Sequence, residues 1–257
     1  MLYENFMDVD TLDKEERQLL EEKYAGDAGA AGFADDRARL AAGEPLAYVI
    51  GWQPFLGLKI WLDSKPLIPR PETEWWTEEL ISYLKHRFTT DEFRLLDLCA
   101  GSGAIGIAIL KAFPNARASF GEISEDHAEL IRKNLRENGI DAARADVRAS
   151  DLFGAFADER YDIIAANPPY VPEGRTLDAS VAEHEPHEAL YAGADGLAII
   201  ERIAAAAPDY LTPGGEAWIE CDSSNAAAAR TLLEPRAKRA ELRTDQYGRP
   251  RLVIGYY

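Results

Sequence analysis

A short apolar run followed at once by two prolines constrains the fold of this chain more than any other segment. Residues 161–166 are bounded by turn-forming residues, a pattern typical of a strand buried in the middle of a parallel sheet. Pro168 and Pro169 have no amide hydrogen to donate, so the strand cannot continue through them. Asn167 and Tyr170 are therefore expected at the carboxyl end of a core strand, where open α/β sheets bind their ligands.

The tetrapeptide Asn167–Tyr170 carries groups that can hold a planar amino group. The Asn167 side chain offers an amide acceptor, and the carbonyl of Pro168 offers a second acceptor, so both N–H bonds of an –NH2 group can be satisfied, with Tyr170 lying over them. Such a site works by positioning a nitrogen opposite an electrophile and needs no charged base. The alternative is a common Asn-Pro turn, and four residues alone do not decide between the two.

A second motif lies upstream of the tetrapeptide. Residues 95–99 predict a buried strand, and Gly101, Gly103 and Gly106 then form a G-x-G-x-x-G pattern that opens a helix. Glycines at these positions permit a tight turn and a close approach of the backbone to a ligand. Glu122 ends the next predicted strand about 20 residues on, where an acid can bind a ribose diol. The spacing therefore indicates a site for a nucleoside-containing cofactor.

The rest of the main domain is expected to complete a sheet. Residues 144–153 predict a third strand, after which Leu152 or Phe153 either covers an adenine ring or packs in the core. Residues 171–193 are polar and rich in turns, which favours a loop that faces the substrate. Its histidines, His184 and His187, have no metal-ligand company, and no metal site is expected. Residues 240–243 and 251–257 predict a final hairpin.

The amino-terminal part differs in character from the main domain. We expect a short helical lobe over residues 1–45, with Thr11 capping its first helix, and a β-hairpin linker over residues 46–70 in which residues 47–51 form a strand. The catalytic domain then covers residues 71–257 and begins with a helix. The lobe either docks a partner or is an ordinary solvated cap. Arg70 and Glu72, which flank the helix start, are predicted to lie within reach of the cofactor.

Charge and cysteine usage narrow the class of protein. The formal net charge is −17, whereas nucleic-acid binders usually carry a basic surface, so direct nucleic-acid binding is not expected. Cys99 and Cys221 form no CxxC pair, which favours reduced, buried thiols in the cytoplasm. The amino terminus has no signal-peptide pattern, and no apolar run approaches the ~18–20 residues of a membrane span.

Together these segments resemble a known family. The chain is similar to the HemK/PrmC protein-(glutamine-N5) methyltransferases, which modify peptide chain release factors. The resemblance spans roughly residues 43–257 and rests on five segments: Gly43–Gly51 with the pattern GEPLAYVIG, LIPRPETE at 67–74, LLDLCAGSGAIGI at 95–107, NPPY at 167–170 and EPHEALYAGADGL at 185–197. NPPY alone occurs in several amino-methyltransferases, but its combination with the other segments is much more specific.

The resemblance implies the fold, the cofactor and the site residues. It implies an α/β, Rossmann-like methyltransferase fold with a seven-stranded sheet whose last strand is antiparallel, and S-adenosylmethionine as the cofactor. The cofactor-binding residues it implies are Asp97, Cys99, Ala100, Gly101, Ser102, Gly103, Glu122, Leu152 and Asn167. The substrate-binding residues are Asn167, Pro168, Pro169, Tyr170, Arg70 and Glu72, with Asn167, Pro168 and Tyr170 as the catalytic set.

The implied partner is a release factor whose glutamine, in a Gly-Gly-Gln loop, enters the site of a monomeric enzyme. Other functions stay open on the sequence alone. The chain could methylate another protein amide, such as a ribosomal-protein glutamine, or an adenine amine in nucleic acid, which its acidity disfavours. It could bind the cofactor without catalysis, although Asn167 argues against this, and a nicotinamide dehydrogenase would leave NPPY unexplained.

Overall fold

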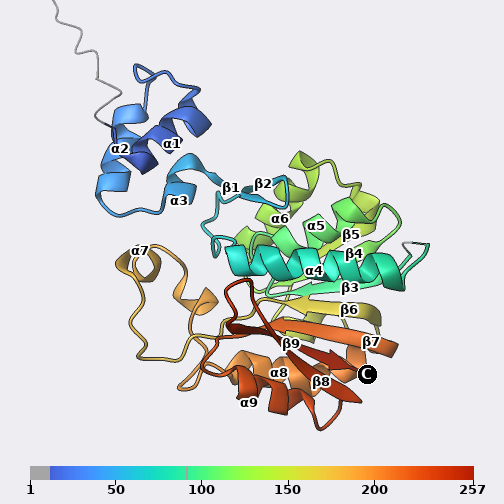
Figure 1. Ribbon diagram of the computed structural model, residues 1–257. Coiled ribbons are helices and arrows are strands. Elements are labelled where there is room, and N and C mark those ends of the chain that lie inside the picture. Colours follow the sequence, from blue (N-terminus) through green and yellow to red (C-terminus); the bar gives the residue numbers. More distant parts are fainter. Residues whose placement is uncertain (1–11, 91) are drawn as a thin grey trace, which may run out of the picture.

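The computed structural model describes residues 12–90 and 92–257, which form a small helical lobe at one end of a larger α/β body (Figure 1). The lobe consists of α1 (Lys14–Tyr24), α2 (Phe33–Ala41) and α3 (Leu46–Ile50). Leu19, Leu20 and Phe33 form a small core of their own in this lobe, together with Val49 and Ile50 of α3.

The first helix is capped by a reciprocal pair of hydrogen bonds. The Asp13 side chain accepts a bond from the backbone N–H of Glu16 at 2.8 Å, and the Glu16 carboxylate accepts one from the backbone N–H of Asp13 at 3.0 Å. This is a capping box, which satisfies two amide groups that the helix itself leaves unpaired. The cap predicted at Thr11 lies outside the described residues.

The strand predicted for residues 47–51 is wrong, because these residues form α3. Pro45 precedes the helix, and Gly51 ends it with φ +98°, a left-handed conformation that favours glycine. The β-branched residues Val49 and Ile50 favoured the prediction of a strand. The segment is instead a helix whose side chains are buried on two sides. Ala47 and Tyr48 pack in the core of the larger body, whereas Val49 and Ile50 pack in the lobe.

A two-stranded hairpin links the lobe to the main body, as predicted. It pairs β1 (Trp52–Phe55) with β2 (Leu58–Trp61) in antiparallel register. The chain then runs through the prolines at 66, 69 and 71 into α4 (Pro71–Arg87), which has Glu72 and Glu74 in its first turn. Acids at this end of a helix are stabilised by the helix dipole.

The main body is built on a seven-stranded sheet in the order β5-β4-β3-β6-β7-β9-β8. Only β9 runs antiparallel to its two neighbours, which confirms the expected topology. The strands span β3 (Arg94–Leu98), β4 (Arg117–Glu122), β5 (Ala145–Ala149), β6 (Tyr161–Ala166), β7 (Leu211–Glu220), β8 (Arg239–Thr244) and β9 (Pro250–Tyr256). The register of β7 against β6 shifts between Tyr161 and Ile163, where residues 212–215 of β7 have no partner in β6.

Helices cover both faces of this sheet (Figure 1). One apolar core joins the sheet to α4, α5 (Ala104–Ala112) and α6 (Glu125–Glu137), and the other joins it to α8 (Ala198–Ala206) and α9 (Ala226–Leu233). Alternation along each strand sends neighbouring residues to opposite cores: Leu95 packs in the first and Leu96 in the second. The alanine-rich helix α9 was not predicted from the sequence.

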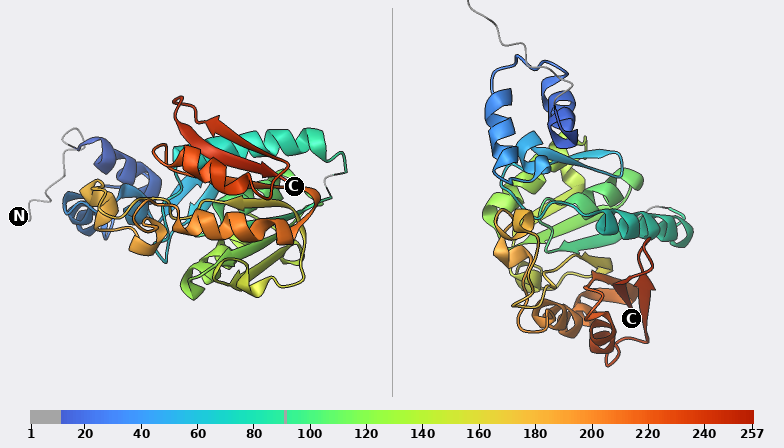
Figure 2. Two further views of the ribbon diagram at one scale, coloured as in Figure 1. Left: turned by 90° about the horizontal axis from the view of Figure 1, so that it is seen from below. Right: turned by 60° about the vertical axis from the view of Figure 1, so that its left-hand side comes forward.

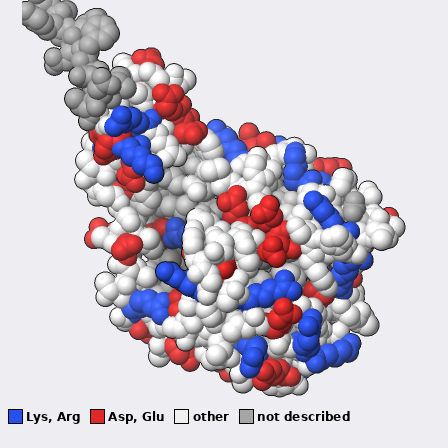
Figure 3. All heavy atoms as spheres, in the orientation of Figure 1, with Lys and Arg blue, Asp and Glu red and all other residues white. Residues whose placement is uncertain are grey.

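The carboxyl ends of the parallel strands face the lobe and the segment 171–197, which contains the short helix α7 (Ala179–Ala182). Further views show this segment on the same side of the sheet as the lobe (Figure 2). Acidic and basic side chains are interspersed on the face seen in Figure 3. In the part of the chain that is described, no helix has the length and apolar character to cross a membrane.

Candidate active site

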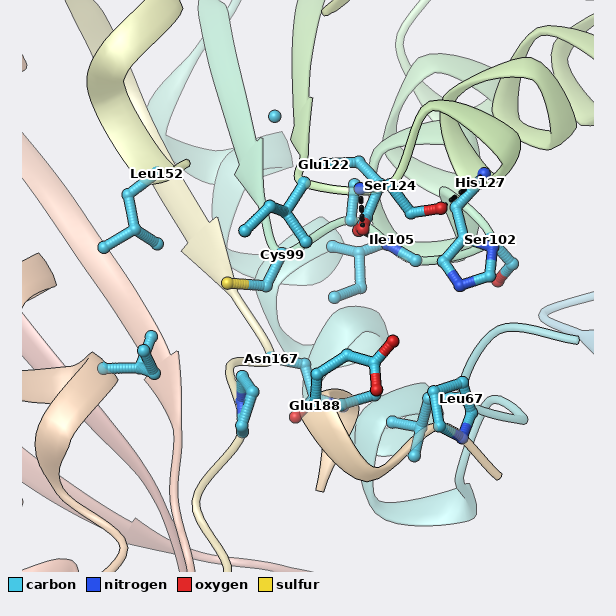
Figure 4. Close-up of a pocket in the computed structure, with 18 of the residues that line it drawn as sticks. Leu67, Cys99, Ser102, Ile105, Glu122, Ser124, His127, Leu152, Asn167 and Glu188 are labelled. Carbon is cyan, nitrogen blue, oxygen red and sulfur yellow. Dashed lines mark hydrogen bonds between the residues drawn. The ribbon is translucent and has the colours of Figure 1, made fainter. Parts of the chain in front are cut away.

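A cavity of about 390 Å³ opens at the carboxyl ends of β3, β4 and β6 (Figure 4). This volume lies in the range of small-molecule sites, and the position is the one that open α/β sheets use for ligands. The lining comes from the segment before α4, the glycine loop, the ends of β4 and β5, the NPPY turn and the segment 186–191. It includes Leu67, Thr73, Cys99–Ser102, Glu122, Leu152, Asn167, Pro169 and Glu188.

The glycine loop forms one wall of this cavity. Gly101 and Gly103 both have positive φ values, +55° and +79°, so the chain turns sharply from β3 into α5. Beneath the loop, the buried Asp97 accepts a hydrogen bond from the backbone N–H of Gly106 at 2.9 Å. A side chain at Gly106 would collide with Phe120, since a Cβ there would lie 2.3 Å from its ring. The start of α5 therefore packs directly against β4, and the glycine loop that precedes it lines the cavity.

Glu122 is held in place by two backbone amides. Its carboxylate accepts bonds from the N–H of Gly101 at 2.7 Å and of Ser124 at 3.0 Å, one on each oxygen. Each carboxylate oxygen can accept more than one hydrogen bond, so both keep capacity for a pair of hydroxyls. This geometry agrees with the diol-binding role predicted for Glu122.

Two apolar side chains line the part of the cavity beyond Glu122. Leu152 borders it at the end of β5, and Ile123 has 66% of its surface exposed although it is a large apolar residue. Ser150 fixes the turn that carries Leu152 by donating a bond to the Leu152 carbonyl at 2.7 Å. Two apolar side chains beside a diol-binding acid fit the ring of a nucleoside.

Cys99 borders the cavity between the glycine loop and the part lined by Leu152 (Figure 4). Burial, reinforced by the carboxylates of Glu122 and Asp97, raises the pKa of the Cys99 thiol well above its ordinary range. The side chain is therefore a neutral thiol at physiological pH. A thiol is a much weaker nucleophile than a thiolate, so Cys99 does not compete with a substrate for an electrophile bound here.

Asn167 presents an unsatisfied acceptor at the cavity. Its Nδ2 donates to the hydroxyl of Thr73 at 3.1 Å, whereas its Oδ1 is buried without a hydrogen-bond partner among the described residues. Buried polar atoms in proteins are nearly always paired, so an unpaired acceptor beside a cavity indicates a ligand group that donates to it. Asn167 lines the cavity together with Pro169, as predicted for its position at the end of β6.

Tyr170 is placed differently from the prediction. It does not line the cavity; its hydroxyl donates to the buried carboxylate of Glu220 at 3.0 Å, and its ring packs against the core that contains α8 and α9. The same carboxylate accepts bonds from Thr73 and Trp76, both at 2.7 Å. Tyr170 therefore anchors the NPPY turn in this structure and does not cover the cavity.

The other predicted site residues divide into two groups. Cys99, Ala100, Gly101, Ser102, Glu122, Leu152, Asn167 and Pro169 all line the cavity, whereas Asp97, Gly103, Pro168, Arg70 and Glu72 do not. Arg70 instead pairs with the buried Glu185 at 2.6 Å, and Glu185 also accepts the backbone N–H of Ile68 at 3.1 Å. This pair joins the LIPRPETE segment to the segment 171–197.

Sequence reasoning missed the buried acid network beside the cavity. Thr73, Trp76 and Glu220 were not predicted as site residues, although they connect directly to Asn167 and Tyr170. One signal was available: Glu220 is an acid within the apolar run 216–221, which was read as a strand. A carboxylate in a core strand needs several hydrogen bonds, so it marks a polar network.

The sheet topology, the glycine loop and the acid at the end of β4 define the chain as a Rossmann-like S-adenosylmethionine-dependent methyltransferase fold. Solved structures with this fold agree. A methyltransferase from Pyrococcus furiosus superposes with a TM-score of 0.57 at 16% identity, covering 87% of this chain and 98% of that one. A Thermus thermophilus 16S rRNA methyltransferase in complex with AdoMet and guanosine gives 0.56 at 19% identity, covering 80% and 49%. A methyltransferase small domain model matches residues 76–196.

The chain belongs to the family of release factor glutamine methyltransferases. The relative from Streptococcus pneumoniae is 33% identical over 245 residues, which cover 94% of this chain and 80% of that protein. The relative from Bordetella pertussis is 38% identical over 222 residues, covering 85% and 80%. Both carry the name "Release factor glutamine methyltransferase". The family predicted from the sequence motifs is thereby confirmed.

Proposed function

We propose that this chain transfers a methyl group from S-adenosylmethionine to the side-chain nitrogen of the glutamine in the Gly-Gly-Gln motif of a peptide chain release factor. The observation that carries the proposal is the buried, unpaired Oδ1 of Asn167 at the edge of the cavity. A primary amide has two N–H donors, and this acceptor fits one of them. The names of the relatives support a release factor as the partner.

The cavity fits S-adenosylmethionine by its chemistry. Glu122 offers acceptors for the ribose hydroxyls, Ile123 and Leu152 offer apolar contacts for the adenine, and the glycine loop at Ala100–Ser102 lines the part left for the methionine end. When bound, the cofactor supplies an electrophilic methyl group on a sulfonium. The amide end of the cavity, at Asn167, adjoins Cys99 and the glycine loop (Figure 4).

The protein's own contribution is to position a weak nucleophile. An amide nitrogen is a poor nucleophile because its lone pair is delocalised into the carbonyl. The Asn167 Oδ1 accepts one of its N–H bonds, which holds the nitrogen still and stabilises the positive charge that develops on it. With the cofactor bound, the N–C bond would form as the sulfonium S–C bond breaks, and the nitrogen would then lose its proton to water, so no charged base is required. Arg70, Glu72 and Tyr170 support the walls of this site in our proposal.

The test is methyl transfer to a purified release factor with labelled S-adenosylmethionine. We expect one methyl group on the Gly-Gly-Gln glutamine, located by peptide mass analysis, and none on a factor whose glutamine is replaced by alanine. The Asn167→Ala variant should keep cofactor affinity within a few-fold and lose turnover by roughly 100-fold or more. Label on DNA, RNA or a ribosomal-protein glutamine in place of the release factor would overturn the proposal.

A further inference from the structure

We propose that Thr73 and Glu220 are positioning residues that determine which end of the Asn167 amide faces the cavity, and thereby select an amide over a carboxylate as the substrate group. The inference rests on the proposed function for the identity of that substrate group. The orientation itself follows from the hydrogen bonds of the described residues alone.

The Glu220 carboxylate receives bonds from three side chains, two in α4 and one in the NPPY turn. It is fully buried at the end of β7, and its Oε2 accepts from Trp76 Nε1 and from the Thr73 hydroxyl, each at 2.7 Å. Its Oε1 accepts from the Tyr170 hydroxyl at 3.0 Å. The indole Nε1–H of Trp76 can only donate and the Thr73 hydroxyl donates to the same oxygen, so Oε2 is the acceptor of both bonds and any proton on Glu220 lies on Oε1.

The single hydroxyl proton of Thr73 determines the direction of the hydrogen bond between Thr73 and Asn167. A hydroxyl has one hydrogen, and the acceptor Oε2 of Glu220 takes it. The Thr73 oxygen can therefore only accept from Asn167, which lies 3.1 Å away. Asn167 must turn its –NH2 toward Thr73 and its Oδ1 away from Thr73, which agrees with the buried Oδ1 that has no partner among the described residues.

This orientation gives the site its selectivity. An oxygen at the cavity accepts the N–H of a glutamine amide but repels the oxygens of a glutamate. A reversed Asn167 would present its –NH2 instead and would favour a carboxylate. Glutamine and glutamate have nearly the same shape, so the orientation of one amide separates them.

The test compares Thr73→Val with Thr73→Ser. Valine keeps the volume of threonine but has no hydroxyl, so it leaves the orientation of Asn167 unspecified, whereas serine keeps the hydroxyl. With a Gly-Gly-Gln peptide we expect Thr73→Val to lose about 10- to 100-fold in kcat, the size expected when a buried acceptor is replaced by a donor. Thr73→Ser should stay within a few-fold of the wild type. Cofactor affinity, measured by calorimetry, should change little in both.

The ratio of the affinities for a glutamine peptide and a glutamate peptide is a second readout. A loss of stability alone would not change this ratio. The wild type should bind a Gly-Gly-Gln peptide more tightly than a Gly-Gly-Glu peptide, and Thr73→Val should reduce this preference about tenfold by gaining affinity for the glutamate peptide. The Glu220→Gln variant is a second control. Its amide oxygen can still accept from Trp76 and Thr73 while its –NH2 faces Tyr170, so the preference should persist. Equal effects of the valine and serine substitutions, or an unchanged preference in Thr73→Val, would overturn the inference.

A spectroscopic measurement separates this inference from the proposed function. In the wild type, the Asn167 side-chain amide signal, assigned by its loss in Asn167→Ala, should exchange slowly with solvent because it donates to Thr73. It should shift and exchange faster in Thr73→Val but not in Thr73→Ser. This result would support the orientation of Asn167 even if no release factor is methylated. A lack of methylation would refute the proposed function but not the orientation. Rapid exchange of this amide in the wild type would refute the orientation. This measurement needs only the wild type, so it holds even if Thr73→Val does not fold.

Discussion

Asp97 provides a quantitative prediction about stability, because it is a fully buried acid beneath the glycine loop. Its Oδ2 accepts the Gly106 N–H, but its Oδ1 has no partner among the described residues. Burial, together with the nearby Glu122 charge, raises the pKa of Asp97 from its ordinary 3.8 to about 8. The folded protein therefore holds a proton on Asp97 at pH values where the unfolded chain has released it.

The sign of the pH dependence follows from this difference in bound protons. Between pH 3.8 and about 8 the folded state binds more protons than the unfolded state, so the free energy of unfolding falls as the pH rises. The slope approaches about 1.4 kcal/mol for each pH unit, and over the whole window the loss amounts to roughly 6 kcal/mol. Below pH 3.8 both states are protonated and the effect is constant; above pH 8 it is complete.

The matched variant is Asp97→Asn, which resembles the protonated acid. Its amide oxygen can accept the Gly106 N–H, and it does not titrate. Urea unfolding at pH 5, 6, 7, 8 and 9, followed by tryptophan fluorescence, should show the wild type losing stability relative to the variant by several kcal/mol across the series. A difference between the two proteins that stays constant with pH would refute the assignment of a protonated, buried Asp97.

Two further predictions concern the NPPY turn and the segment that faces it. Gly196 has φ +74°, and a Cβ there would lie 2.1 Å from the Tyr170 carbonyl oxygen. Gly196→Ala should therefore lower stability by about 2–4 kcal/mol and reduce activity, as measured by thermal unfolding and turnover, and wild-type values for both would contradict the close approach. Glu185→Ala removes the buried partner of Arg70. It should cost about 2–3 kcal/mol and speed proteolysis within residues 171–197, whereas the same cleavage rate as the wild type would show that this pair does not hold the segment.

Local patterns in the sequence were enough to predict most of the main domain. The strands and helices from α4 to α6, the strand β6 and the final hairpin follow from apolar periodicity and from turn residues at their ends. The cavity residues Glu122 and Asn167 were also predicted, because each follows a core strand and all parallel strands of a sheet end at the same edge. Both lie where this reasoning places them.

Contacts between distant segments could not be predicted in the same way. Thr73 is 94 residues from Asn167 and 147 from Glu220, and no local pattern reports such pairing. Tyr170 was expected to cover the substrate, yet its hydroxyl finds a buried carboxylate from a neighbouring strand. The strand predicted at residues 47–51 failed for a related reason, since β-branched residues fit either a strand or a helix that is buried on both sides.

The short helix α3 mechanically couples the lobe to the cavity. Its residues belong to two cores at once, so the lobe cannot swing without pulling Ala47 and Tyr48 out of the larger core. The Tyr48 hydroxyl donates to the Pro66 carbonyl at 2.6 Å, and the next residue, Leu67, lines the cavity. Packed interiors resist gradual deformation and pass displacement on to their neighbours. A load applied to the lobe is thus transmitted through one helical turn to the rim of the cavity.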